Sequence, residues 1–162
     1  MKQLTLLALL FIPLVAAAAD TKTDSSFYRD AAQGGLAEVE AGRLAQEKSS
    51  NQKIKDFAAM MVKDHSAANE ELKSVAASEN VTLPSSPSVA QRANRVKLEV
   101  LSGDSFDKAY IKNQVAAHKS TVALLQKEIA SGQSNAGKTF ARKILPTVRS
   151  HLKAITEISQ SH

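Results

Sequence analysis

Four polar residues of this 162-residue chain stand where helical spacing calls for apolar ones: Glu38, His65, His118 and His151. The clearest case is His65, which lies in the middle of a stripe of residues that recur at alternating steps of four and three. That spacing is typical of the buried face of an amphipathic helix. The stripe consists of Ile54, Ala58, Met61, His65, Ala68, Leu72 and Val75. A carboxyl group and three imidazoles at core positions must satisfy one another, because burying an isolated charge is costly.

Two interpretations of these four residues compete. Neutral imidazole is the commonest metal ligand in proteins, and three histidines with one carboxylate form a complete ligand set for Zn or an incomplete one for Fe, Mn or Cu. The alternative is a dry polar layer in which Glu38 accepts hydrogen bonds from one or two histidines. Asp64, beside His65, is a weaker candidate for a group that orients a histidine. Gln114, one turn before His118, is a weaker candidate for an amide oxygen donor.

The sequence offers little for catalysis without a metal. It contains no cysteine, and it has no G-x-S-x-G nucleophile motif, no P-loop and no dinucleotide-binding glycine motif. We therefore expect a protein that binds a metal or supports the cell envelope rather than one that turns over a substrate. A structural or interaction module is the second hypothesis, and a metal-dependent oxidoreductase is the third.

Four long segments with helical spacing must position the polar residues. They cover roughly 27–48, 51–78, 105–130 and 135–159, and none shows the alternation of a strand. Each polar residue lies near the middle of its own segment, so the four side chains should meet at one height whichever way each helix points. The expected fold is all-α, a four-helix bundle.

The connector between the second and third long segments contains its own signals. Asn80 to Pro87 is rich in proline and hydroxyl residues and reads as an extended linker. Ser86 followed by Pro87 predicts the start of a short extra helix, and Gly103 is suited to end it in the left-handed conformation. Pro146 lies inside the last long segment, where we expect it to kink the helix.

The chain begins with the features of a secretory signal peptide over residues 1–19. Lys2 precedes an apolar run from Leu4 to Val15, and Ala17-x-Ala19 is a small-residue cleavage site. The run is shorter than the ~20 residues that a membrane span needs, so we expect an exported, periplasmic protein without a transmembrane segment. Residues 20–26 are expected to form a disordered lead-in, and 27–160 a single domain.

The charge and composition of the chain limit the kinds of partner that it could bind. The chain carries 21 basic and 16 acidic residues, which are interspersed along it, and it has no tryptophan. A nucleic-acid-binding stripe of basic and aromatic residues is not visible. The diffuse positive charge leaves open a weak contact with anionic envelope polymers, beside ordinary surface solvation. Without cysteines, packing or a metal must hold the fold.

Four stretches form a recognisable set: FYRDAAQGGLAEVE from Phe27 to Glu40, MVKDH from Met61 to His65, SFDKAY from Ser105 to Tyr110 with His118, and LPTVRSHL from Leu145 to Leu152. Together they resemble an uncharacterised family of exported bacterial proteins that is often labelled "predicted outer membrane protein". The resemblance implies a domain of unknown function with a ferritin-like helical bundle. It covers nearly all of the chain after the signal peptide.

The ferritin-like resemblance also favours a metal, but the chain departs from the di-iron pattern. Di-iron members of that fold carry Glu-x-x-His on two helices. Here Val62, Val115 and Val148 stand three residues before the three histidines. The carboxylates that bridge two irons are missing, so a single metal ion is the most that the sequence supports.

Overall fold

The computed structural model describes residues 22–162, so the predicted signal peptide lies outside the described residues. The described part is entirely helical and contains no strand. Its five helices are α1 (Lys22–Lys48), α2 (Gln52–Ser78), α3 (Val89–Glu99), α4 (Gly103–Ser131) and α5 (Asn135–Ser161). Four of them have 27 to 29 residues, whereas α3 has 11. The predicted all-α class and the short helix in the connector are confirmed.

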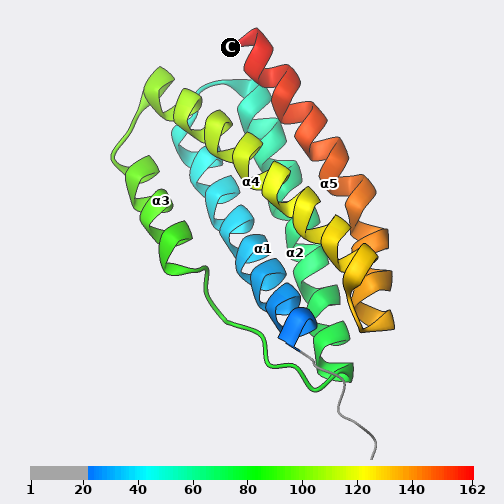
Figure 1. Ribbon diagram of the computed structural model, residues 1–162. Coiled ribbons are helices and arrows are strands. Elements are labelled where there is room, and N and C mark those ends of the chain that lie inside the picture. Colours follow the sequence, from blue (N-terminus) through cyan, green and yellow to red (C-terminus); the bar gives the residue numbers. More distant parts are fainter. Residues whose placement is uncertain (1–21) are drawn as a thin grey trace, which may run out of the picture.

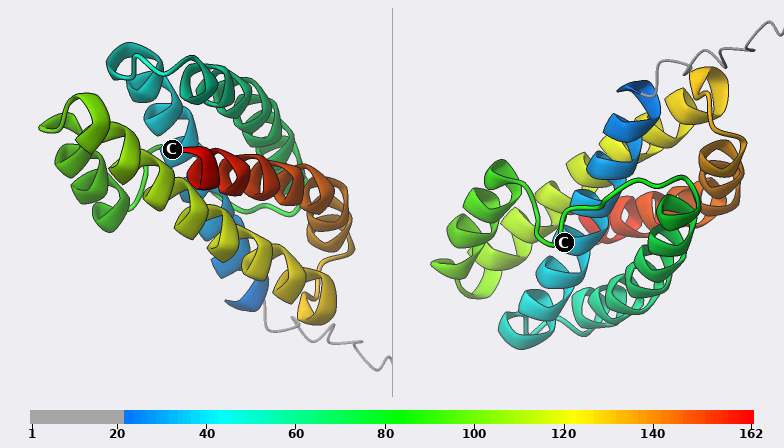
Figure 2. Two further views of the ribbon diagram at one scale, coloured as in Figure 1. Left: turned by 90° about the horizontal axis from the view of Figure 1, so that it is seen from above. Right: turned by 90° about the horizontal axis from the view of Figure 1, so that it is seen from below.

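The four long helices pack side by side (Figure 1). α1 and α2 form one hairpin and α4 and α5 form another, while α1 also packs against α4 and α2 against α5. The segment between α2 and α4, which includes α3, runs back along the length of the bundle (Figures 1 and 2). Neighbouring long helices are therefore antiparallel throughout. One long crossover is also a feature of ferritin-like bundles, and the ferritin-like relation itself stays a prediction.

The helix starts follow local capping chemistry. The Asn51 side chain accepts a hydrogen bond from the backbone N–H of Lys53, as expected for a cap of α2. The predicted start of the short helix at Ser86 and Pro87 is wrong. Ser88 caps α3 instead, because its hydroxyl accepts from the N–H of Gln91 while the Gln91 side chain accepts from the N–H of Ser88.

Two expectations about single positions can be compared with the structure. Gly103 adopts a left-handed φ of 54°, as predicted, but it is the first residue of α4. Pro146 lies inside α5, which continues through it as one helix. The kink expected at Pro146 stays a prediction.

The N-terminal end of α1 differs from the predicted disordered lead-in over 20–26. α1 already begins at Lys22, so residues 22–26 are helical. The physical reason is a long-range contact that spacing does not reveal. The buried carboxylate of Asp24 accepts hydrogen bonds from the backbone N–H groups of Gln133, at 2.9 Å, and Ser134, at 2.6 Å, in the turn between α4 and α5.

Two apolar clusters fill the core, one toward each end of the bundle. The first gathers Leu44, Ala45, Ile54, Phe57, Ala58, Met61, Leu98, Phe106, Tyr110, Ile111 and Ile155. The second gathers Phe27, Tyr28, Ala32, Leu72, Ala76, Leu125, Phe140, Ala141 and Val148. On each long helix, the polar residue singled out above falls between a member of the first cluster and a member of the second. The polar residues thus divide the core at mid-height.

Replacing Asp24 with alanine should destabilise the fold. Two backbone N–H groups of the α4–α5 turn would lose their acceptor, which typically costs about 1–3 kcal/mol for buried groups. We expect a fall of this size in the free energy of unfolding, measured by urea denaturation followed by circular dichroism. Asp30→Ala is the matched control, because Asp30 is exposed and pairs with its sequence neighbour Arg29 rather than with a distant part of the fold. Equal stability of the two variants would contradict this role of Asp24.

Candidate metal centre

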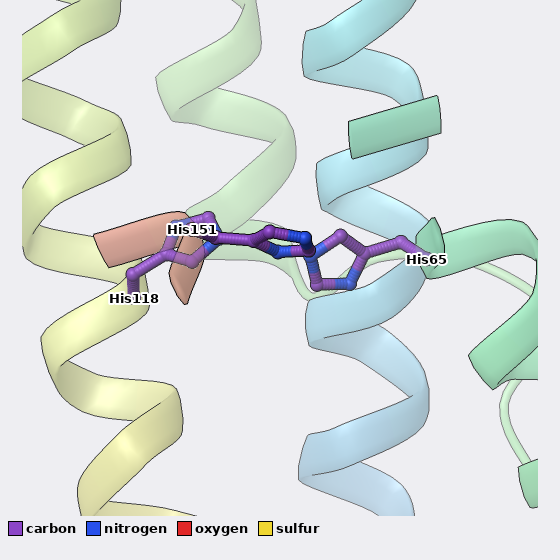
Figure 3. A group of neighbouring side chains, drawn as sticks. All are labelled: His65, His118 and His151. Carbon is purple, nitrogen blue, oxygen red and sulfur yellow. The ribbon is translucent and has the colours of Figure 1, made fainter. Parts of the chain in front are cut away.

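Three histidines from three helices meet at mid-height of the bundle. His65 comes from α2, His118 from α4 and His151 from α5, and their rings lie close together (Figure 3). The ring centroids are 5.5 to 5.7 Å apart in all three pairs. One ring nitrogen from each histidine lies within 4.8 Å of the other two. The relative exposures are 8%, 1% and 2%, so the cluster, which we call the histidine triad, is buried.

Two of the three rings, those of His118 and His151, are each oriented by a hydrogen bond to one ring nitrogen. Nδ1 of His118 lies 2.9 Å from the backbone carbonyl oxygen of Gln114, to which it can only donate. Nε2 of His151 lies 3.0 Å from a carboxylate oxygen of Asp64 on α2. When a neutral imidazole donates through one nitrogen, the other nitrogen keeps its lone pair. His118 and His151 are therefore held with Nε2 and Nδ1, respectively, available as electron donors.

Three buried nitrogens have no hydrogen-bond partner within the described residues: Nε2 of His65, Nε2 of His118 and Nδ1 of His151. A buried polar atom without a partner typically costs about 1–3 kcal/mol. The predicted dry layer, in which Glu38 accepts from histidines, would have paired such atoms. Each histidine also offers one ring nitrogen within 4.8 Å of the other two, an arrangement that could hold a metal ion.

Burial favours the neutral imidazole at His65 and His151. It lowers the pKa of His65 from 6.5 to about 3, and the neighbouring His118 and His151 act in the same direction. Burial also lowers the pKa of His151, although the hydrogen bond to Asp64 opposes this shift. Because a metal binds the neutral form of histidine, His65 and His151 could bind a cation at neutral pH without first losing a proton.

Glu38 is buried on α1, but it lies outside the triad. Burial raises the pKa of its carboxyl group, while His118 and a hydrogen bond from the Gln114 side chain act in the opposite direction. The carboxyl group is thus directed toward Gln114, one turn away from His118 along α4. Of the four predicted ligands, the structure brings the three histidines together and leaves Glu38 apart from them.

Asp64 and Gln114, the two weaker candidates, make different contacts with the triad. Asp64 contacts a histidine of another helix, His151, rather than the adjacent His65. Gln114 contacts His118 through its backbone carbonyl, whereas its side chain serves Glu38. A side-chain oxygen of Gln114 is therefore not directed at the triad.

Sequence reasoning missed other buried polar groups. Asp107, Tyr110 and Glu128 are at most 4% exposed, and each has an oxygen without a partner among the described residues. Burial, followed by the charge of Asp24, raises the pKa of Glu128 to about 7. Asp107 lies four residues before Ile111, on the stripe that leads to Gln114 and His118. Helical spacing could have identified Asp107 as a core position.

Acid should destabilise the metal-free protein through His65. Unfolded His65 takes up a proton near pH 6.5, whereas the folded chain holds its pKa at about 3. The unfolded state therefore binds more protons between these values, and stability falls as the pH drops. Between pH 7 and 5 the contribution is about 1–2 kcal/mol. Urea denaturation of the original chain and of His65→Gln at both pH values checks this. The variant should lose less stability, and equal losses would contradict the shift.

The chain was compared with known proteins by sequence and by fold. No curated protein matches the chain. A DUF305 fragment from Deinococcus radiodurans has a TM-score of 0.75 at 12% identity, covering 86% of this chain and 97% of its own. A DUF305 protein from Streptomyces coelicolor, described as secreted, has a TM-score of 0.71 at 14% identity, covering 84% and 89%. CopM in its Cu(I)-bound form has a TM-score of 0.70 at 16% identity, covering 85% and 96%.

At these identities the solved structures show a shared helical fold. No helix within residues 22–162 is long and apolar enough to cross a membrane. The family model that matches is that of DUF4142, a domain of unknown function, and it covers residues 13–158. The chain therefore belongs to the DUF4142 family.

Proposed function

We propose that this protein is an exported helical-bundle protein that binds one transition-metal ion through His65, His118 and His151. The observation that carries the proposal is the buried triad: each histidine offers one ring nitrogen within 4.8 Å of the other two, and each has a buried ring nitrogen without a partner within the described residues. One ion would satisfy all three at once. Export rests on the predicted signal peptide and agrees with the secreted DUF305 neighbour.

The three imidazole donors limit which metal ions would suit the site. Three neutral imidazoles suit Zn, Cu, Fe or Ni, whereas Mn and non-haem Fe sites commonly use carboxylates. Glu38 lies outside the triad, and Val62, Val115 and Val148 occupy the positions where the di-iron pattern has carboxylates. Among Zn, Fe, Mn and Cu, the triad fits Zn or Cu best. The likeness to CopM, which is known in Cu(I)-bound and Ag-bound forms, supports copper.

A structural module is the alternative function. In that case the triad would only align the helices where the two apolar clusters meet, and a surface would carry the function. Buried polar groups can specify register in helical assemblies. The unpaired nitrogens favour metal binding over this alternative, because a layer that serves only to align helices gains nothing from leaving them unsatisfied.

Metal titration tests the proposal. Metal-free protein without a histidine tag is titrated with Zn²⁺ and, under reducing conditions, with Cu⁺, and bound metal is measured by mass spectrometry. We expect one ion per chain, lost in His65→Ala and His151→Ala. His162→Ala is the matched control, because His162 lies at the chain end beside Asp104, outside the triad, and should keep full binding. No bound ion, together with lower stability of the triad variants, would favour the structural alternative.

Asp64 should act as a positioning residue for His151. Its carboxylate holds Nε2, so that Nδ1 faces the triad. Removing such a partner typically lowers metal affinity 10- to 100-fold. We expect Asp64→Ala to keep one ion per chain but to bind it 10- to 100-fold more weakly in competition with a chelator. Asp56→Ala, on the exposed side of the same helix, is the control. Equal affinities would mean that Asp64 does not orient the ligand.

A further inference from the structure

We infer that the metal ion reaches the triad through the opening between α2 and α5. This inference rests on the proposed function and adds the route and the direction of binding. The opening is a cavity of about 240 Å³ between the two helices. Its lining includes His65 and His151, and the other residues are Asp64, Ala67, Ala68, Glu71, Ile144, Thr147 and Val148.

The other cavities near the site are less suited to this role. The larger cavity between α1, α3 and α4, of about 510 Å³, is lined by Glu38 and Gln114 but by no residue of the triad. Another cavity has a volume of only about 40 Å³, and of the three triad residues only His65 lines it. Of these cavities, only the one between α2 and α5 is lined by two of the proposed ligands. An ion entering there meets two imidazoles without displacing a helix.

The lining of the cavity indicates the order in which an entering ion would contact the three histidines. His118 is 1% exposed and does not line the α2–α5 cavity, whereas His65 and His151 do. An incoming ion would therefore meet His65 and His151 first and His118 last. His118 stands at the inner end of the route, with its Nε2 unpaired toward the triad.

The charges at the mouth favour a cation. The side chains of Asp64 and Glu71 are 31% and 33% exposed, and both line the cavity. Lys143 of α5 does not line the cavity, but its Nζ lies 2.8 Å from a carboxylate oxygen of Glu71 on α2. Carboxylates at a partly enclosed mouth raise the local cation concentration. Lys143 opposes this effect, so Glu71 and Lys143 should change the rate of uptake in opposite directions.

Blocking the mouth tests the route. Ala67 is exposed on α2 and lines the cavity, so Ala67→Trp places a large ring there with little effect on the core. Uptake of Zn²⁺ and of Cu⁺ by metal-free protein is followed by stopped-flow competition with a fluorescent chelator. We expect uptake at least tenfold slower in Ala67→Trp. Ala68→Phe, placed deeper in the same cavity, is a second blocking variant.

Ala116→Trp is the matched control. Ala116 is an exposed alanine in the middle of α4 and lines the cavity between α1, α3 and α4. It should leave the uptake rate unchanged. Slow uptake in Ala116→Trp with normal rates in both α2 variants would overturn the route and place the entrance at the other cavity.

Charge changes provide an independent measurement. Glu71→Gln should slow uptake about two- to fivefold, and Lys143→Gln should speed it by a similar factor. Both effects should shrink as salt rises, because the charges at the mouth are partly exposed. Normal rates in all variants, with one ion still bound at equilibrium, would overturn the route but leave the proposed function intact. No binding of either ion by the original chain would overturn the proposed function and the route together.

Discussion

Three buried imidazoles with unpaired nitrogens, enclosed between two apolar clusters, are the constraint on which the rest of the structure depends. Within residues 22–162, one nitrogen of His118 and one of His151 have hydrogen-bond partners, whereas a second nitrogen of each, and Nε2 of His65, have none. Buried polar atoms without partners oppose folding. The single metal ion that we propose would pair with these nitrogens and so offset that cost.

The bundle supports this arrangement through helices that are distant in sequence. α2 supplies both His65 and Asp64, and Asp64 reaches across to orient His151 on α5. The long connector runs back along the bundle, so that α4 is antiparallel to α1 (Figure 1). The His118 ring on α4 lies beside the rings of His65 and His151. The Asp24 carboxylate ties the start of α1 to the turn between α4 and α5. The triad therefore depends on contacts between both hairpins.

Glu38 and the three histidines look alike in sequence, because each interrupts an apolar stripe, but they have different surroundings in the structure. The partner of Glu38 is the Gln114 side chain, and burial favours the protonated form of Glu38. The triad consists of three histidines, with no carboxylate within it. This distinction moves the expected metal from carboxylate-rich iron or manganese sites toward zinc or copper.

The sequence alone determined the helices, their approximate bounds and the burial of the four polar residues, because helical spacing fixes the side of a helix on which each residue lies. Spacing does not determine which neighbouring helix faces that side, nor how a side chain turns within the core. Only the tertiary structure therefore separated Glu38 from the triad and paired Asp64 with His151. The early start of α1 also depended on a long-range contact, from Asp24 to the α4–α5 turn, that helical spacing does not encode. The orientation of a core side chain depends on how neighbouring helices pack against each other, and that packing arises only when all side chains fit together.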